Sequence, residues 1–366
     1  MPLTIARLSR IIGDLKKKRR NNPTTTKKLL KMLEVDGSYL EGGGQILRTA
    51  LSLSLITNKP VRIFNIRKKR PQPGLKNQHL AVIKALTQIF SSQVEGAYLG
   101  SQEIRFFPNQ IKGRVSLNID IGTAGSVGLL IQAILPAIIF SKNLEISLQI
   151  KGGTAGKWAI PCDYYPYIVF PLLEIKADLQ ILRRGYYPKG GGLVKLRVAS
   201  QKLKALNFLE RGKSLKIKIL SIASQDLKLR KVSERALSQA EKNLKERYRN
   251  IPVEGECLYS ETYSSGLEVN ICFYFEKTRL WSDSLGERRK TSEEVGREAS
   301  QKLIQEESSG ACVDRHLADN LIPYLAFSRG SFKTSEITNH TLTNIKIVEQ
   351  FLGKIFEVKD NVVRRI

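Results

Sequence analysis

Residues 33–57 read LEVDGSYLEGGGQILRTALSLSLIT, in which a short strand pattern is followed by a glycine turn and an apolar helix pattern. The turn is Gly42-Gly43-Gly44, and the helix is predicted from about Gln45 to Ile56. Backbone N–H groups at such a helix start can bind an anion. A tight turn that needs positive φ angles would explain the same glycines, so this segment alone leaves both interpretations open.

The order of strand, glycine turn and apolar helix recurs further along the chain. A second turn, Gly122-Thr123-Ala124-Gly125-Ser126, precedes an apolar helix predicted at 127–140. Leu47 and Leu129 occupy matching places after the two turns, which indicates an internal repeat of about eighty residues. A third helix of the same kind is predicted at 314–327. Its late position indicates that another domain is inserted before it.

The remaining hydrophobic patterns complete this organisation. We expect strands at 61–66, 102–107, 115–119, 144–150, 178–184 and 192–198, and helices at 77–90 and 163–176. The insertion is predicted at 212–308, with strands at 214–222, 253–259, 267–275 and 279–285 and charged helices at 232–248 and 291–305. Residues 34–211 and 309–366 would form one large domain. The sequence therefore predicts an α/β protein with a smaller inserted α/β domain.

The charge of the chain is strongly positive. Residues 1–33 contain ten Lys or Arg against one acid, Asp14, and are expected to be a flexible basic arm or an extension added by an upstream start site. The net charge is +26, of which +17 remains without this arm. Such a surplus needs a polyanionic partner or an anionic membrane surface. Transmembrane and signal-peptide patterns are missing from the sequence, so we expect a cytoplasmic protein.

Two familiar motifs can be excluded from the sequence. The stretch GGTAGKW at 152–158 resembles a nucleotide P-loop, but its first glycine is one place too late and Lys157 is followed by Trp158 instead of Ser or Thr. The cysteines are widely spaced and form no Cys-x-x-Cys pair, so buried thiols are expected in place of disulfides or zinc ligands.

A basic loop separates the predicted strand 61–66 from the helix 77–90. It reads RKKRPQPGLK at 67–76 and contains five cations in ten residues. Charge runs are usually solvated surfaces. This run lies between two ordered elements and follows the glycine-rich helix start, so it is also a reasonable phosphate-binding loop.

Two of the three histidines lie near the end of the chain. His340 is predicted where a strand ending near Ile337 turns into a helix at 342–351, among threonines that could cap that helix. Histidine is one of the residues that form covalent intermediates, although a capping or packing role fits this position too. On the helix at 314–327, His316 and Asn320 share a face with Asp319 beside them, which suits either a purine or ribose site or a polar surface.

Seven segments together resemble the RNA 3′-terminal phosphate cyclases. They occur in order over residues 33–366 and are VDGSYLEGGGQILRTALSLSLITNKP (35–60), IRKKRPQPGLKNQHLAVIKAL (66–86), GTAGSVGLLIQAILPAIIF (122–140), GGT (152–154), RGYYPKGGG (184–192), VDRHLADNLIPYLAF (313–327) and HTLTNIKIVEQF (340–351). The resemblance implies a large domain of three β-α-β-α-β-β repeats with a smaller α/β domain inserted before the third.

The resemblance also implies a reaction. ATP adenylylates a histidine, AMP passes to an RNA 3′-terminal phosphate, and the neighbouring 2′-hydroxyl closes a 2′,3′-cyclic phosphate with release of AMP. By its place in the motifs, His340 matches the adenylylated histidine. Glu41 matches an acid that helps to hold Mg²⁺ or Mn²⁺ on the ATP phosphates.

The remaining site residues carry over in the same way. The nucleotide pocket is matched by Gln132, His316, Asp319 and Asn320, although the family more often has Gln at the position of Asn320. The arginines that hold the RNA phosphate are matched by Arg48, Arg67 and Arg70. The alternatives are a catalytically inactive cyclase-like protein of ribosome assembly or rRNA processing, which would lack the adenylylated histidine, and an RNA-binding module without catalysis.

Overall fold

The computed structural model describes residues 32–40 and 42–366. The prediction of a basic arm at 1–33 therefore falls almost wholly outside the described residues, and so does Glu41. Everything below concerns the described part of the chain.

The first repeat forms from the segment that opened the sequence analysis. Its elements are β1 (Leu33–Asp36), α3 (Gly44–Thr57), β2 (Val61–Phe64), α4 (Asn77–Phe90), β3 (Gln93–Glu95) and β4 (Ile104–Phe107). The strands make a sheet in the order β1-β2-β4-β3, in which only the β1–β2 pair is parallel. The predicted helix 77–90 has the observed bounds of α4, because its apolar positions recur at helical spacing.

The second repeat has the same order of elements. They are β5 (Gly113–Asp120), α5 (Val127–Ile139), β6 (Leu144–Gly152), η1 (Tyr165–Val169), α6 (Phe170–Leu172), β7 (Ala177–Arg183) and β8 (Gly192–Ala199), with the sheet order β5-β6-β8-β7. The helix predicted at 163–176 is confirmed only in part. Helical backbone covers residues 165–172, five of them as a π-helix and three as a single α-helical turn. Pro171 has no N–H to donate, which interrupts the α-helical hydrogen-bond pattern in this stretch.

The third repeat is interrupted after its first strand. It consists of β9 (Leu206–Phe208), α9 (Arg315–Phe327), β14 (Gly330–Lys333), α10 (Asn339–Leu352), β15 (Phe356–Lys359) and β16 (Val362–Arg365), with the sheet order β15-β16-β14-β9. Strand β9 pairs in parallel with β14. Helix α10 begins at Asn339, three residues before the predicted start at Leu342, so His340 lies in its first turn.

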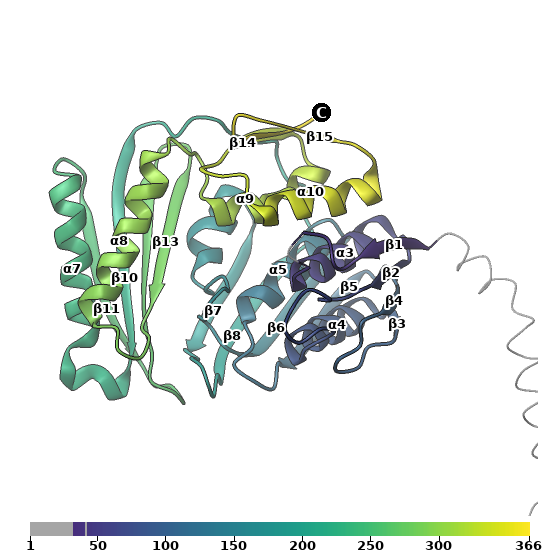
Figure 1. Ribbon diagram of the computed structural model, residues 1–366, viewed down its shortest axis with the longest axis horizontal. Helices are drawn as coiled ribbons and strands as arrows, with labels where there is room; N and C mark the ends of the chain where they lie inside the picture. Colours follow the sequence, from purple (N-terminus) through teal and green to yellow (C-terminus); the bar gives the residue numbers. More distant parts are fainter. Residues whose placement is uncertain (1–31, 41) are drawn as a thin grey trace, which may run out of the picture.

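The intervening residues form a separate layer pair with its own core (Figure 1). Its elements are β10 (Ser214–Ser224), η2 (Gln225–Arg230), α7 (Val232–Arg247), β11 (Val253–Ser260), β12 (Leu267–Phe275), β13 (Arg279–Leu285) and α8 (Ser292–Ser308). The strands follow the order β11-β10-β12-β13, and α7 and α8 pack against them. We call this the inserted unit. The predicted fold class, α/β repeats with a smaller α/β insertion, is confirmed.

The helices of the three repeats meet in the interior. Helix α3 packs on α5 and α10, and α9 packs on α5 and α10. In Figure 1, α9 and α10 lie between the strands β14 and β15 and the helices α3 and α5. Helix α5 is buried on almost every face, as an apolar sequence without a polar stripe requires. Within the described residues, no helix has the length and apolar content needed to cross a bilayer.

A buried ion cluster connects the second repeat to the inserted unit. The Arg184 guanidinium donates to Asp163, with Nη2 at 2.9 Å from Oδ1, and to Glu268 of β12, with Nη1 at 3.1 Å from Oε1. The Tyr186 hydroxyl donates to the same Glu268 oxygen at 3.0 Å. All four side chains are buried. Burial raises the pKa of Glu268, and the neighbouring Arg184 opposes that rise.

Arg184→Met should destabilise the protein by roughly 3 to 5 kcal/mol, because Asp163 and Glu268 would stay buried without their cation. Chemical denaturation measures this change. The matched control is Arg114→Met, which removes an exposed ion pair with Glu145 and should cost about 1 kcal/mol or less. Equal effects of the two substitutions would contradict a structural role for the cluster.

Candidate functional site

A chain of hydrogen bonds joins helices from all three repeats. Arg48 of α3 donates from Nε to Oε1 of Gln132 on α5 at 3.1 Å. Gln132 donates from Nε2 to Oδ1 of Asn320 on α9 at 2.7 Å, and Asn320 donates from Nδ2 to the carbonyl of His316 at 2.6 Å. The structure thus brings together residues from three distant parts of the sequence. The half-buried amide of Gln132 and the buried amide of Asn320, which would be costly alone, are paired with each other.

Helix α10 is fixed against the first repeat. The Gln45 side chain donates from Nε2 to the carbonyl of His340 at 3.1 Å, and the Thr49 hydroxyl donates to Oδ1 of Asn344 at 2.7 Å. These contacts bring the first repeat against the last, as the predicted site requires. His340 is exposed in the first turn of α10, where the helix dipole favours phosphate.

Asp319 holds the start of α10. Its Oδ1 accepts hydrogen bonds from the hydroxyls of Thr338 and Thr341 at 2.7 and 2.6 Å, and its carbonyl accepts from Asn344 at 2.7 Å. Burial raises the pKa of Asp319, while the two threonine hydrogen bonds and the nearby histidines favour its charged form. The resemblance implied a nucleotide contact at this position. The observed contacts are those of a residue that positions the turn carrying His340.

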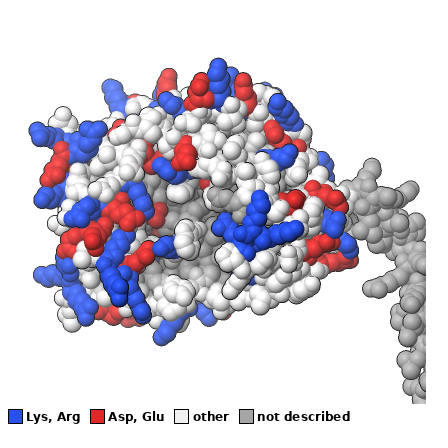
Figure 2. Space-filling view, in the orientation of Figure 1, with Lys and Arg blue, Asp and Glu red and all other residues white. Residues whose placement is uncertain are grey.

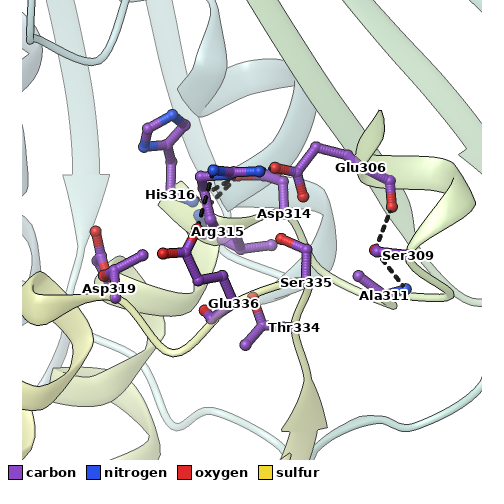
Figure 3. Close-up of polar contacts among 12 residues, drawn as sticks. Glu306, Ser309, Ala311, Asp314, Arg315, His316, Asp319, Thr334, Ser335 and Glu336 are labelled. Atoms are coloured by element: carbon purple, nitrogen blue, oxygen red, sulfur yellow. Dashed lines mark hydrogen bonds and ion pairs between the residues drawn. The ribbon is translucent and has the colours of Figure 1, made fainter. Parts of the chain in front are cut away.

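The start of α9 is held by charged side chains. Asp314 caps the helix by accepting from the N–H groups of His316 and Leu317, and the Tyr164 hydroxyl donates to the same carboxylate. Burial raises the pKa of Asp314 to about 6. Arg315 pairs with Glu306 at 2.5 Å and with Glu336 at 3.0 Å. Figure 3 shows the exposed His316 imidazole pointing away from these ion pairs, so it is left accessible beside α10.

A small cavity lies beneath this surface. Arg48, Gln132, Asp319, Asn320 and Asn344 are among its lining residues, and its volume is about 20 Å³. Such a space admits about one water molecule and no nucleotide. A nucleotide would therefore have to lie on the exposed side of the helix junction, where the imidazoles of the two C-terminal histidines are accessible.

Arginine side chains and a histidine surround the start of α3. A Cβ atom added to Gly44 would lie 2.3 Å from Nε2 of His79 and 3.2 Å from Nη1 of Arg48. One added to Gly43 would lie 3.3 Å from Nη2 of Arg70. We call Arg48, Arg67, Arg70 and His79 the α3 cluster. Glycine is needed in this turn because the side chains of the cluster approach its backbone directly.

His79 was missed by the sequence analysis. It lies three residues into α4, directly after the basic loop, and this place beside the predicted phosphate-binding residues is the signal that could have found it. Its Nδ1 accepts from the Lys76 N–H at 3.0 Å. Burial, followed by the charges of Arg48, Arg67 and Lys76, lowers the pKa of His79 to about 3. The imidazole is therefore neutral at physiological pH.

The predicted arginines of the α3 cluster differ in their contacts. Arg67 donates from Nη1 to the carbonyls of Gln72 and Gly74 at 2.7 and 3.0 Å, so it shapes its own loop. Burial and the nearby Arg70 lower the pKa of Arg67. Burial also lowers the pKa of Arg48 to about 10, which leaves it charged at neutral pH. The cluster keeps a positive field at the N-terminus of α3.

A divalent-metal site remains a prediction. Glu41 lies outside the described residues, and residues 32–40 and 42–366 hold no group of three His, Cys, Asp or Glu suited to a metal ion. All four cysteines are free thiols; Cys162, Cys272 and Cys312 are buried, as predicted, whereas Cys257 is half-buried.

Figure 2 shows a hollow between the repeats and the inserted unit, with Lys and Arg side chains gathered beside it. The shape and the charge of this face suit a polyanion better than a neutral metabolite.

Comparisons with known proteins agree on one family. Residues 39–358 match the model of the RNA 3′-terminal phosphate cyclase family. A protein of that name from Pyrococcus furiosus is 42% identical over 334 residues, which are 90% of this chain and 96% of the relative. A protein of the same name from Thermococcus onnurineus is 43% identical, over 91% of this chain and 97% of the relative. One from Ignicoccus hospitalis is 41% identical, over 88% of this chain and 94% of the relative.

The depressed pKa of His79 predicts a loss of stability in mild acid. Below pH 6.5 the unfolded chain binds a proton at this residue that the folded chain does not, so the unfolding free energy should fall by about 1.4 kcal/mol per pH unit from this group. Denaturant titrations between pH 6.5 and 5 measure the slope. His79→Gln should make it shallower by about this amount, and an unchanged slope would show that His79 is protonated in the folded protein.

Proposed function

The chain belongs to the RNA 3′-terminal phosphate cyclase family, and from this premise we propose that it uses ATP to convert an RNA 3′-terminal phosphate into a 2′,3′-cyclic phosphate. The observation that carries the proposal is the contact between Gln45 and the His340 carbonyl. It sets His340, at the N-terminus of α10, beside the α3 cluster at the N-terminus of α3. The start of α10 would supply the nucleophile, and the α3 cluster would supply positive charge for a phosphate. Free thiols throughout suit a reducing compartment such as the cytoplasm.

In the first step, a His340 nitrogen attacks the α-phosphorus of ATP. A phosphorus–nitrogen bond forms, the bond to the β-phosphate oxygen breaks, and diphosphate leaves. The dipole of α10 favours negative charge at its first turn, and Asp319 keeps that turn in place through Thr338 and Thr341. His316 is exposed on the neighbouring helix, where it would contact the rest of the nucleotide. Asn320 would act from beneath this surface, through its hydrogen bonds to Gln132 and to the His316 carbonyl.

In the second step, an oxygen of the RNA 3′-phosphate attacks the phosphorus of the histidine adenylate. The phosphorus–nitrogen bond breaks and His340 is released. The RNA phosphate then carries AMP as a leaving group, which a phosphate monoester lacks. The 2′-hydroxyl attacks the RNA phosphorus, AMP departs, and the cyclic diester forms. The hydroxyl proton passes to solvent or to a nearby base.

The α3 cluster would hold the RNA phosphate. Arg70 and Arg48 approach the glycine turn of α3 from two sides, and forked guanidinium groups suit phosphate oxygens. The neutral His79 can share a hydrogen bond without adding charge. Arg67 supports this arrangement by ordering the basic loop.

A divalent ion fits one part of this scheme. Glu41 in the glycine signature offers a hard oxygen ligand, and Mg²⁺ or Mn²⁺ held there would neutralise charge on the ATP phosphates.

Incubation with α-labelled ATP and a divalent metal should place acid-labile, alkali-stable label on the wild-type protein. His340→Ala should abolish the label, because the nucleophile is gone. His316→Ala should weaken labelling without abolishing it, since the nucleophile remains. A folded wild-type protein that stays unlabelled would support the inactive or binding-only alternatives.

RNA that ends in a 3′-phosphate should be cyclised, and the same RNA with a 3′-hydroxyl should not, because no phosphate oxygen is available to accept AMP. Chromatography of the labelled termini distinguishes the products. ATP consumption that does not depend on the terminal phosphate would overturn this assignment.

Arg70→Ala should raise the KM for RNA roughly 10- to 100-fold, the size expected for a lost charge-assisted contact, and should leave self-adenylylation unchanged. Steady-state kinetics and the labelling assay measure the two effects. The control is Arg105→Ala, since Arg105 pairs with Glu95 and Glu103 away from the site. Loss of labelling in Arg70→Ala would contradict a role limited to RNA.

A further inference from the structure

Three aromatic side chains are exposed on neighbouring loops and have no role in the proposed reaction. Trp158 is 89% exposed, Tyr187 is 82% exposed and Tyr263 is 52% exposed. Large aromatic surfaces of this kind are unfavourable in water, and their usual use is the binding of a partner.

Two of these loops are packed on the same short segment. A Cβ atom added to Gly153 would lie 2.5 Å from the Ala124 carbonyl oxygen, and one added to Gly190 would lie 2.7 Å from the Ala124 Cα. The Thr154 N–H also donates to the Gly185 carbonyl at 2.9 Å. The loop that carries Trp158 and the loop that carries Tyr187 are therefore fixed side by side.

The third aromatic residue comes from the inserted unit. The Tyr263 ring lies against Gly191, where an added Cβ atom would be 2.2 Å from the ring, and the Arg183 guanidinium lies 4.4 Å from the ring centroid. Lys189 donates its N–H to the Ser264 hydroxyl at 3.1 Å. Tyr263 thus braces the Tyr187 loop from the side.

Cations accompany the exposed rings. Lys157 lies 5.2 Å from the Trp158 ring centroid, and Lys189 follows Tyr187 by two residues. Glu287 pairs with Lys157 at 3.3 Å and orders it. Asp226 and Glu261 line a separate pocket with Tyr263. Because these carboxylates repel an anion, an anion-binding face can extend only on the side of Trp158 and Tyr187.

Residues 122–125 connect this face to the helix that carries His79 of the α3 cluster. A Cβ atom added to Gly125, the residue after Ala124, would lie 3.7 Å from the Gln78 Cβ, and Gln78 directly precedes His79 on α4. An RNA held at the cluster would pass over residues 122–125 to reach the two exposed rings.

We propose that Trp158 and Tyr187 form a stacking platform for unpaired bases that precede the terminal phosphate of the RNA. The inference rests on the proposed function and adds the substrate class, which is RNA with a single-stranded 3′ end. Every base presents a π-face, so the platform accepts any sequence. Lysines beside the rings meet the phosphates between those bases. In a duplex end the bases are already stacked, and the rings would gain little.

Tryptophan fluorescence tests the platform independently of catalysis. Stacking of a base on Trp158 should quench the emission when a 3′-phosphorylated single-stranded oligonucleotide is titrated in, and Trp158→Phe should lose most of that quenching while keeping affinity. Trp158→Ala and Tyr187→Ala should each weaken binding roughly 10-fold, within the range of one lost stacking contact. Both positions are exposed, so the variants should fold.

The kinetic arm uses 3′-phosphorylated RNAs of one, three and ten nucleotides. The two alanine variants should raise the KM for the longer RNAs, leave kcat and self-adenylylation unchanged, and have no effect on the mononucleotide. The control is Leu215→Ala, which removes a half-exposed apolar side chain. Leu215 lies near the start of β10, whereas the end of β10 at Ser224 pairs with Gly266, close to the Tyr263 loop.

The outcomes separate the two proposals. Wild-type protein that never adenylylates but shows quenching would overturn the proposed function and keep the platform. Normal adenylylation with unchanged RNA affinity in both alanine variants would overturn the platform alone. An equal rise in KM for the mononucleotide would also overturn the platform, because it would indicate that the two rings have a structural role. Tighter binding of a duplex end or of an acidic peptide would overturn the single-stranded RNA as the substrate class.

Discussion

The hydrogen bonds that join Arg48, Gln132 and Asn320 hold three repeats in one arrangement. An apolar helix such as α5 could slide against its neighbours if only leucine and isoleucine contacts held it. A buried amide that loses its partner costs about 1 to 3 kcal/mol, so the polar chain permits one register of the helices. The same register places the His340 turn against α3. Closure of the fold and assembly of the site are therefore one event.

The sequence predicted most elements because hydrophobic periodicity is local information. The bounds of α4 agree with the prediction, whereas the helix predicted at 163–176 is shorter and mostly π-helical, because hydrophobic periodicity does not report the hydrogen-bond pattern. The sequence patterns did not predict which side chains of different repeats contact one another. Asp319 of α9 is paired with Thr338 and Thr341 at the start of α10, and no local pattern encodes which partner such an acid finds. His79 contacts Lys76 and the start of α3 within the first repeat, where the hydrophobic pattern does not show how the loop before α4 folds back.

Net charge predicted a polyanionic partner or an anionic membrane surface without showing which cations serve it. Arg184 neutralises two acids inside the protein, and Arg67 orders its own loop. Arg70 faces a glycine turn at a helix start, and Arg48 faces the same turn while its Nε donates to Gln132. The acceptors within reach of each guanidinium separate these roles, and the number of cations does not.

The break between β9 and α9 has a consequence for biosynthesis. A ribosome releases the first two repeats and β9 early, but β9 obtains its parallel partner β14 only after the whole inserted unit has emerged. Until α9 and α10 have been made, Gln132 has no Asn320 to donate to and Gln45 has no His340 carbonyl. A chain that ends before α9 would therefore expose the apolar faces of α3 and α5 on which α10 and α9 pack. Such incomplete chains would be prone to aggregate.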